Sequence, residues 1–304
     1  MSIDVDWPLH APENGRFEGR ARDLATPADG SLPRIIASDS IQGNFGSHRT
    51  IADIRSGPTG LDVAALAGQK AGSSLRAAID GLFGDASHEA PLYLLLDDLA
   101  GASLVSKWCW ARYHAIPDPH AGIPADDFGG MAGVCIGFRP GSSAFVRAIG
   151  DGKPKLACVL PLIDPVDPVG WHDFPEHGTN IHFRRARLID VWMEGDQICV
   201  QSLFQDSANL PGTALREALH EYRLEATADR QSGRLMSLEA TAGTLPHPEC
   251  QSATANIEVL LGTPMQHLRS AVLEWLKRTA GCTHLNDMIR ALGEVPLLAE
   301  NLDR

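Results

Sequence analysis

Four segments in the middle of the chain alternate apolar and polar side chains, and short polar turns join them in pairs. The segments are residues 182–193, 197–206, 219–229 and 234–243. Such alternation places successive side chains on opposite faces of a strand, and a short polar turn between two such runs is typical of a hairpin. Four consecutive strands joined in this way predict an antiparallel β-meander.

The apolar spacing changes after the last of these strands. Residues 251–261, 264–279 and 282–293 carry apolar side chains at helical intervals, and Gly281 ends the second of these helices. A sheet followed by helices is typical of the α+β class. We therefore expect an α+β fold in which a curved antiparallel sheet is covered by the C-terminal helices.

The N-terminal part of the chain has a mixed pattern. Strands are expected over residues 16–25 and 33–41, and a helix is expected over 99–113, with Asp97 or Asp98 as its cap. The apolar run just before this helix fits a buried strand or a helix start equally well.

Repeated prolines mark residues 151–181. Because proline interrupts helices, we expect an irregular connector that runs over the surface or covers a site. The chain then reads as a single domain, residues 1–304. It comprises a mixed α/β part (1–150), the connector, and the sheet with its helices (182–304).

Length and charge narrow the classes of function. The 304 residues are 44% hydrophobic and carry a formal net charge of −12, so the chain can bury a core, and a nucleic acid or an anionic membrane would repel it. The first residues lack the stretches of a secretory signal, and no segment has the length of a membrane span. The six scattered cysteines fit a reducing compartment. We expect a soluble cytoplasmic protein without nucleic-acid or membrane partners.

Familiar catalytic motifs are absent from the sequence. It has no G-x-x-x-x-G-K-[ST] loop, no G-x-G-x-x-G turn, no G-x-S-x-G elbow and no H-E-x-x-H helix. This removes the motif case for nucleotide hydrolysis, dinucleotide redox chemistry, esterase activity and zincin activity. Cofactor-free acid–base chemistry and ligand binding remain.

Candidate acid–base residues lie on the third strand of the meander. Its alternation sends His220, Tyr222 and Leu224 to one face, and Glu221 and Arg223 to the other. If the first face is the core, His220 and Tyr222 are buried polar groups that need partners, which makes them catalytic candidates together with Glu221. Arg223 is a candidate for holding a substrate anion. A satisfied core histidine and a cross-strand charge ladder explain the same residues.

The last predicted helix begins at Gly281, Cys282, Thr283 and His284. A helix N-terminus carries partial positive charge, lowers the pKa of a thiol and attracts anions, and Thr283 can cap it. Asp287 shares a helix face with His284, where its carboxylate can orient the imidazole. His284 is thus a catalytic candidate, and Cys282 and Asp287 are candidates for substrate binding. An ordinary helix start in a tight turn is the alternative.

A zinc site is a further alternative. His247, Cys250, Cys282 and His284 have the ligand types of a tetrahedral zinc site. The Cys-x-x-Cys knuckle usual in structural zinc sites is absent, and two buried, reduced cysteines at a helix junction explain the same pattern. We expect no cofactor, with zinc as the alternative.

Arginines and an acidic pair supply further candidates for substrate binding. Arg20 and Arg22 share one predicted strand, and residues 183–187 hold three more arginines. A guanidinium offers paired donors to a carboxylate or phenolate, although solvated strand faces paired to Asp or Glu explain these residues too. Asp97 and Asp98 can hold a metal or act as acid and base, or they can simply cap a helix.

Several stretches of the C-terminal part resemble one family. HEYRLEATAD, RLMSLEATAGTLPHPEC, NIEVLLG and GCTHLNDMIRAL, in this order, resemble the domain of unknown function 2889 family over about residues 183–298. GRARDL and LLLDD resemble the longer members of that family. Carried over by position, the motif residues are His220, Glu221, Tyr222, Arg223, Glu225, Glu249, Cys250, Cys282, Thr283, His284, Leu285 and Asp287.

The resemblance implies an activity. Relatives of this kind are associated with bacterial breakdown of aromatic compounds, including cofactor-free release of formaldehyde from lignin-derived aromatic dimers. It therefore implies a cofactor-independent carbon–carbon lyase that acts on a small aromatic substrate by acid–base chemistry. A non-catalytic binding protein for an aromatic or steroid-like ligand and a zinc-dependent hydrolase remain alternatives, and a homodimer stays open.

These expectations depend on one arrangement in space. Cys282 and His284 must lie next to His220 and Tyr222, around a cavity shielded from water. If the two groups of side chains lie far apart, the expected site does not exist.

Overall fold

The computed structural model describes most of the chain. The described residues are 1–8, 14–58, 61–84, 91–113, 131–147, 159–178, 180–209, 212–213 and 215–303. The chain divides into two compact units. The first unit comprises Met1–Ala115, Cys158–Arg187 and Asp206–Glu217, and the second unit comprises Ile116–Ala157, Leu188–Gln205 and Ala218–Arg304.

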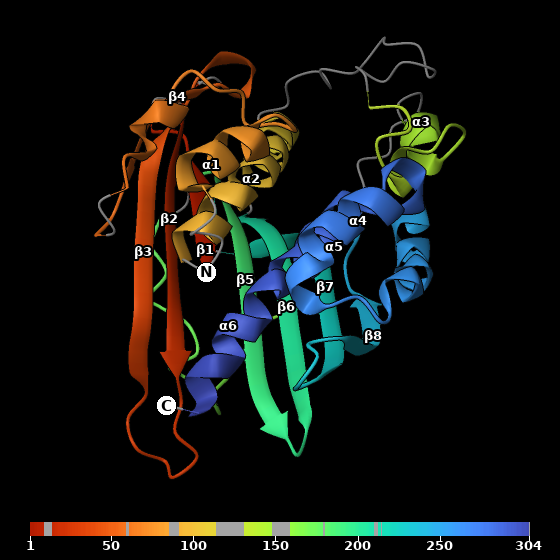
Figure 1. Cartoon of the computed structure of the whole chain (residues 1–304). Coiled ribbons are helices and arrows are strands. Elements are labelled where there is room, and N and C mark those ends of the chain that lie inside the picture. Colours follow the sequence, from red (N-terminus) through yellow and green to blue (C-terminus); the bar gives the residue numbers. More distant parts are fainter. Residues whose placement is uncertain are drawn as a thin grey trace. The chain divides into compact units, whose positions relative to one another are not determined.

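Within the described residues, eight strands form one antiparallel sheet (Figure 1). The strands are β1 (Ser2–Asp6), β2 (Gly15–Ala25), β3 (Arg34–Phe45), β4 (Ile51–Ser56), β5 (His182–Glu194), β6 (Gln197–Asn209), β7 (Arg216–Asp229) and β8 (Leu235–Ala242). Their order is β4-β3-β2-β1-β5-β6-β7-β8. The predicted strands and the α+β class are confirmed, whereas β1 and β4 were not predicted.

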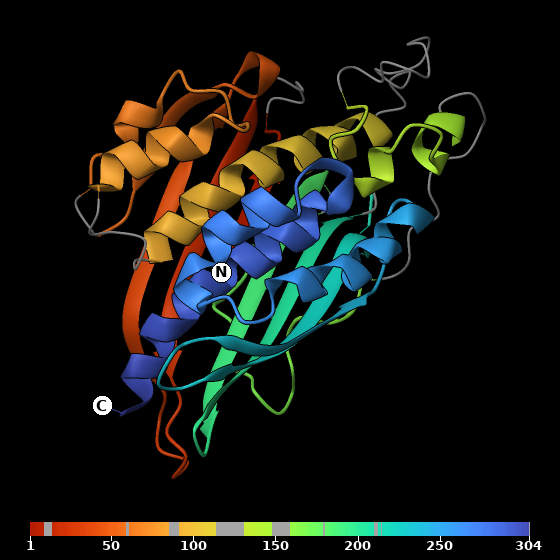
Figure 2. The same cartoon turned by 45° about the vertical axis from the view of Figure 1, so that its right-hand side comes forward.

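In the first unit, two helices cover one face of the strands (Figure 2). Ile3, Val5 and Phe17 alternate with polar residues along β1 and β2 and are fully buried. The helix α2 (Pro91–Tyr113) packs on β1, β2 and β3, and α1 (Leu75–Phe83) packs on α2. The apolar alternate of β1 and β2 therefore faces the helices, and the polar alternate lies on the other face.

The apolar run before residue 99 forms the first part of α2. The run and the predicted helix form one helix of 23 residues that begins at Pro91. Asp97 and Asp98 lie inside it, so the predicted helix cap is wrong. Asp97 instead accepts a hydrogen bond from Nε of Arg76 at 2.6 Å, and Asp98 accepts from Nη2 of Arg187 at 2.8 Å.

In the second unit, the C-terminal helices pack on the strands. The α-helices are α3 (Ser143–Arg147), α4 (Leu268–Trp275), α5 (Thr283–Ala291) and α6 (Val295–Glu300). One buried core joins the sheet to these helices and includes Phe204, Tyr222, Leu224, Leu238, Met265, Val272, Leu285 and Ile289. The predicted covering of the meander by C-terminal helices is confirmed.

The described residues also form 3₁₀ segments, and some of these take the place of predicted helices. They are η1 (Ser47–Arg49), η2 (Val63–Leu66), η5 (Ile136–Phe138), η6 (Pro248–Leu260), η7 (Met265–His267), η8 (Arg278–Ala280), η9 (Leu292–Glu294) and η10 (Asn301–Asp303). The helix predicted over 251–261 is η6, and the one over 264–279 is reduced to α4 between η7 and η8. The chain leaves α4 in a tight turn, since Arg278 has φ 55°.

The connector has the irregular backbone that its prolines predict. Its described part, residues 159–178, contains neither a helix nor a strand beyond an isolated bridge between Asp164 and Asp167.

Among the residues that the structure describes, no helix is both long enough and apolar enough to cross a membrane.

Candidate functional site

Side chains from β7, η6 and α5 meet in the second unit. The hydroxyl of Tyr222 donates to Sγ of Cys282 at 3.3 Å. The rings of His220 and His284 stack, with centroids 3.6 Å apart and planes inclined by 20°. The thiol of Cys250 also hydrogen bonds to Cys282. The structure thus brings the start of the last long helix beside the third meander strand, as the sequence predicts.

The alternation of β7 places the side chains of Tyr222 and His220 on the buried face of the strand. Tyr222 is 1% exposed and His220 is 8% exposed, whereas Arg223 is exposed on the other face of the strand. Ala242 lies opposite Tyr222 in the register with β8. The predicted assignment of faces holds for these residues, and Arg223 points away from the stacked imidazoles.

Glu221 departs from this alternation. It is 7% exposed, and its Oε1 accepts a hydrogen bond from Nε2 of Gln205 at 3.0 Å. Its Oε2 accepts from the backbone N–H of Thr244 at 3.4 Å. The expectation of a solvated charge ladder is therefore wrong for Glu221, because the chain after β8 folds back over this end of β7.

The turn before α5 sets the position of Cys282. A Cβ on Gly281 would lie 2.4 Å from the carbonyl oxygen of Leu276, so only glycine fits there. Cys282 follows as the N-cap, and its carbonyl accepts the N–H of Asn286 at 2.8 Å. Thr283 is already helical, so the predicted cap by Thr283 is wrong. The thiol lies at the positive end of the α5 dipole.

Hydrogen bonds decide where the protons lie among the two thiols and the phenol. Cys282 accepts from the Cys250 thiol, and together with contacts from His284 and Tyr222 this holds the pKa of Cys282 well below its ordinary value, although burial opposes the shift. The contact with Cys282 raises the pKa of Cys250. Burial raises the pKa of Tyr222. Of these three groups, Cys282 is the one whose charged form its contacts favour.

His284 is the least buried member of the group. Its ring lies between His220 and Phe204, whose ring centroid is 6.0 Å away. The other members are almost fully enclosed, and Cys282 is 1% exposed. Asp287 is half-buried, one turn further along α5. A reactant can therefore approach the imidazoles more readily than the thiolate.

Arg20 and Arg22 lie in the first unit, on β2, where they bind the connector. Nη2 of Arg20 donates to the carboxylate of Glu18 at 2.6 Å, and its Nη1 donates to the carbonyl of Asp173 at 3.3 Å. Nη2 of Arg22 donates to the carbonyl of Val169. Both side chains therefore hold the connector against the strand, and substrate binding by them stays a prediction.

The arginines at the start of β5 are not on a solvated face. Arg185 and Arg187 are 0% and 1% exposed. Nε and Nη2 of Arg185 each donate to Asp206 at 2.8 Å, and Arg187 is bound to Asp98. The alternative of solvated strand faces paired to Asp or Glu holds for the pairing of both residues and is wrong for the solvation, because both ion pairs are buried.

The residues of the zinc alternative lie around the same group. Cys250 and Cys282 are in contact, and the ring of His247 packs edge-on against Phe138 at 5.4 Å. The described cysteines, which are Cys109, Cys135, Cys199, Cys250 and Cys282, are free of disulfides, and Cys158 lies outside the described residues. Zinc binding stays a prediction.

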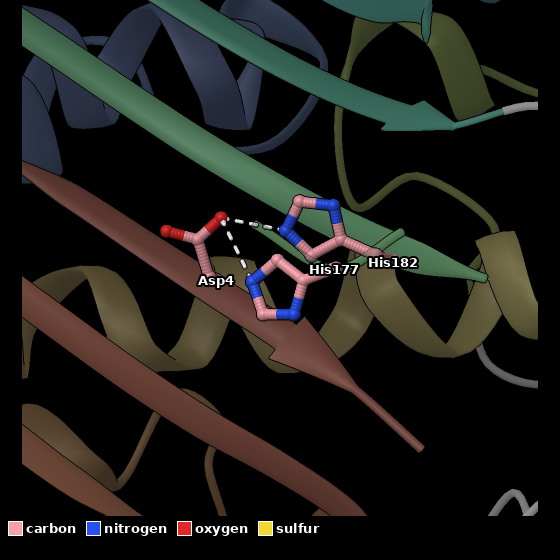
Figure 3. A group of neighbouring side chains, drawn as sticks. All are labelled: Asp4, His177 and His182. Carbon is pink, nitrogen blue, oxygen red and sulfur yellow. Dashed lines mark hydrogen bonds and ion pairs between the residues drawn. The ribbon is translucent and has the colours of Figure 1, made fainter. Parts of the chain in front are cut away.

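A second group of polar side chains, Asp4, His177 and His182, lies in the first unit (Figure 3). The sequence patterns do not predict it. Asp4 of β1 accepts hydrogen bonds at 2.6 Å from Nε2 of His182 and from Nε of Arg184, both on β5. His177 of the connector stacks on His182 at 3.8 Å, and its Nε2 lies 3.9 Å from Asp4. Asp4 and His182 are 178 positions apart, so no motif links them. The only signal is the clustering of histidines near residue 177.

This second group makes stability depend on pH. Burial lowers the pKa of His182 from 6.5 to about 3. Below pH 6.5 the unfolded chain binds a proton at His182, whereas the folded chain binds it only below about pH 3. The unfolded state therefore binds more protons, and stability falls as the pH drops through this window, by about 1.4 kcal/mol per pH unit for each proton. The pKa of Asp4 is also lowered, which acts in the same direction.

Urea unfolding at a series of pH values measures this slope. We expect His182→Gln to reduce the slope by about one proton, while His267→Gln at an exposed histidine leaves it unchanged. An unchanged slope in His182→Gln would contradict the assignment.

Comparison with known proteins gives one match. The model of a family described as "Protein of unknown function (DUF2889)" matches residues 183–297. No curated protein and no solved structure matches the chain. The matched range leaves out β1 to β4 and contains His220, Tyr222, Cys250, Cys282 and His284.

Proposed function

We propose a function from the site and from the resemblance, because residues 183–297 match the model of the DUF2889 family, whose name carries no activity. The chain is a cofactor-independent carbon–carbon lyase that releases formaldehyde from a small hydroxymethyl-bearing aromatic compound of the lignin-dimer type. The stacked pair of His220 and His284 beside the Cys282 thiolate is the observation that supports the acid–base chemistry. The aromatic substrate class rests on the resemblance alone.

The stack offers an acid and a base side by side. Of two imidazoles in contact, one ring can donate a proton to a substrate while the other accepts one. His284 also contacts Cys282. In the proposed reaction, His284 is the acid and His220 is the base.

The proposed reaction balances without a redox partner. The substrate is an aryl 1,3-diol. His220 takes the proton of the hydroxymethyl group, and the bond from this carbon to the next one breaks to release formaldehyde. The electron pair of that bond forms a carbon–carbon double bond conjugated to the ring and expels the second hydroxyl group. His284 protonates this group, which leaves as water.

Cys282 and Tyr222 act through His284 in this proposal. Each is 1% exposed, so neither touches the substrate. Cys282 contacts His284 and holds its ring in place, and the Tyr222 hydroxyl donates to the sulfur of Cys282. Both are positioning residues, a different role from the direct proton transfer by Tyr222 that the sequence suggests.

The experiment is formaldehyde release by the purified full-length chain from a panel of aryl 1,3-diols. We expect turnover by protein freed of metal with a chelator, and no turnover of analogues that carry a methyl group in place of the hydroxymethyl group. Tight binding of the panel without formaldehyde would replace the proposal by a ligand-binding protein. Activity that is lost with the chelator and restored by zinc would favour the zinc-dependent enzyme.

A further inference from the structure

The group around Asp4 has, by residue type, the composition of a metal site. Asp4, His177 and His182 each offer one ligand atom, and these atoms lie within 4.8 Å of one another. Figure 3 shows both imidazoles turned toward one carboxylate oxygen. A carboxylate with two imidazoles suits divalent transition metals. The protons and charges around this group nevertheless argue against a cation.

His182 has both ring nitrogens committed. Nη1 of Arg216 lies 2.7 Å from Nδ1 of His182, and a guanidinium can only donate, so Nδ1 accepts. The proton of the neutral ring is then on Nε2, which donates it to Asp4 at 2.6 Å. A metal bound at Nε2 would displace this proton and leave an imidazolate, which is unfavourable.

Arg216 has no carboxylate partner among the described residues. Its Nε and Nη2 donate to the hydroxyl oxygen of Ser207 at 3.2 Å and 3.0 Å. Within the described part of the chain, Arg216 forms no ion pair with a carboxylate. Burial and the neighbouring Arg184 lower the pKa of Arg216 to about 10. Nη1 of Arg216 donates one hydrogen bond, to Nδ1 of His182, so the second N–H group on Nη1 remains for a ligand.

The nearby carboxylates are already paired. Arg184 donates to Asp4 at 2.6 Å and lies over the ring of Phe174 at 4.1 Å. Asp6 accepts two hydrogen bonds from Arg16, at 3.0 Å and 2.6 Å. With these two ion pairs balanced, the positive charge of Arg216 is the net charge of the group. A divalent cation would add to this charge, whereas an anion would balance it.

We propose that Arg216 and its neighbours in the first unit bind a small carboxylate. A carboxylate brings one negative charge, which matches the one unbalanced guanidinium, and its two oxygens fit the planar N–H groups of arginine. Phosphate carries more charge than the site lacks. His182, fixed between Asp4 and Arg216, keeps the guanidinium in place. This site is independent of the proposed lyase chemistry at His220 and His284.

Calorimetric titration of the full-length chain with benzoate, inorganic phosphate and zinc chloride tests the proposal. We expect benzoate to bind once per chain, and Arg216→Gln to weaken its binding about tenfold or more. Arg55→Gln, at an exposed arginine of the same unit, should bind benzoate like the wild type. Arg216→Lys keeps the charge and loses the planar geometry, so it should weaken binding by less than Arg216→Gln.

Several results would overturn the proposal. These are absence of benzoate binding to the wild type, equal benzoate affinity in both Arg216 variants, and stronger binding of phosphate at Arg216. Zinc binding that His182→Gln abolishes would restore the metal assignment. If Arg216→Gln does not fold, as judged by circular dichroism, the comparison of Arg216→Lys with the wild type decides. None of these readouts involves formaldehyde, so the proposed activity stands or falls separately.

Discussion

We expect Gly101→Ala to lower the free energy of unfolding by about 3 kcal/mol, although alanine usually favours a helix interior. Gly101 lies within α2, and a Cβ there would be 1.9 Å from Nη1 of Arg185. The guanidinium cannot simply move away. It is fully buried, donates twice to Asp206 at 2.8 Å, and lies 3.5 Å from Asp98. Relief of the clash would break a buried ion pair.

Gly81→Ala is the matched control. Gly81 lies inside α1, and a Cβ there would meet nothing within 4 Å. Because only helix propensity and chain entropy change, we expect this variant to be more stable by about 0.5–1 kcal/mol. Urea unfolding of both variants and the wild type measures the difference. A Gly101→Ala variant as stable as Gly81→Ala would show that Arg185 is not held as described.

Formaldehyde release should fall about 10²- to 10⁴-fold in His284→Asn and in His220→Asn. Each substitution removes one of the two groups that move a proton in the proposed reaction, while asparagine keeps a polar side chain of similar reach. The loss should appear in kcat more than in KM, because proton transfer belongs to the chemical step. The double variant should lose little more than either single variant, since the two imidazoles act as one unit.

The controls separate chemistry from folding. His267→Gln changes an exposed histidine in the same unit and should leave kcat unchanged. Tyr222→Phe should reduce kcat less than either imidazole variant, and it should shift the pH profile, because it removes a donor to the thiolate without removing a proton carrier. Unchanged turnover in His284→Asn with a folded chain would exclude His284 from the reaction.

Local pattern was enough to predict the sheet of the second unit. The alternation of His220, Tyr222 and Leu224 identified the buried face of β7, and the Gly281-Cys282 step marked the start of α5. Both signals arise within a few residues, where strand and helix geometry fix which side chains share a face. The approach of Cys282 to Tyr222 followed from placing these two elements in one α+β layer.

Ion pairs between segments far apart in the chain could not be predicted from the local sequence pattern. Arg185 and Arg187 read as outward-facing polar residues, yet both are buried, because Asp98 and Asp206 come from other segments of the chain. The partner of His182, Asp4, lies 178 positions away, on a strand of five residues too short to stand out. Propensity also failed at η6, where tertiary packing selects 3₁₀ turns in place of an α-helix.

The central claim is that its contacts hold Cys282 as a thiolate at neutral pH, beside the imidazole of His284. The ultraviolet absorbance that distinguishes a thiolate from a thiol measures this directly. We predict one thiolate per chain at neutral pH in the wild type and in Cys199→Ser, and none in Cys282→Ser. Absorbance that appears in the wild type only above the ordinary thiol pKa of about 8.5, or that survives in Cys282→Ser, would contradict the account.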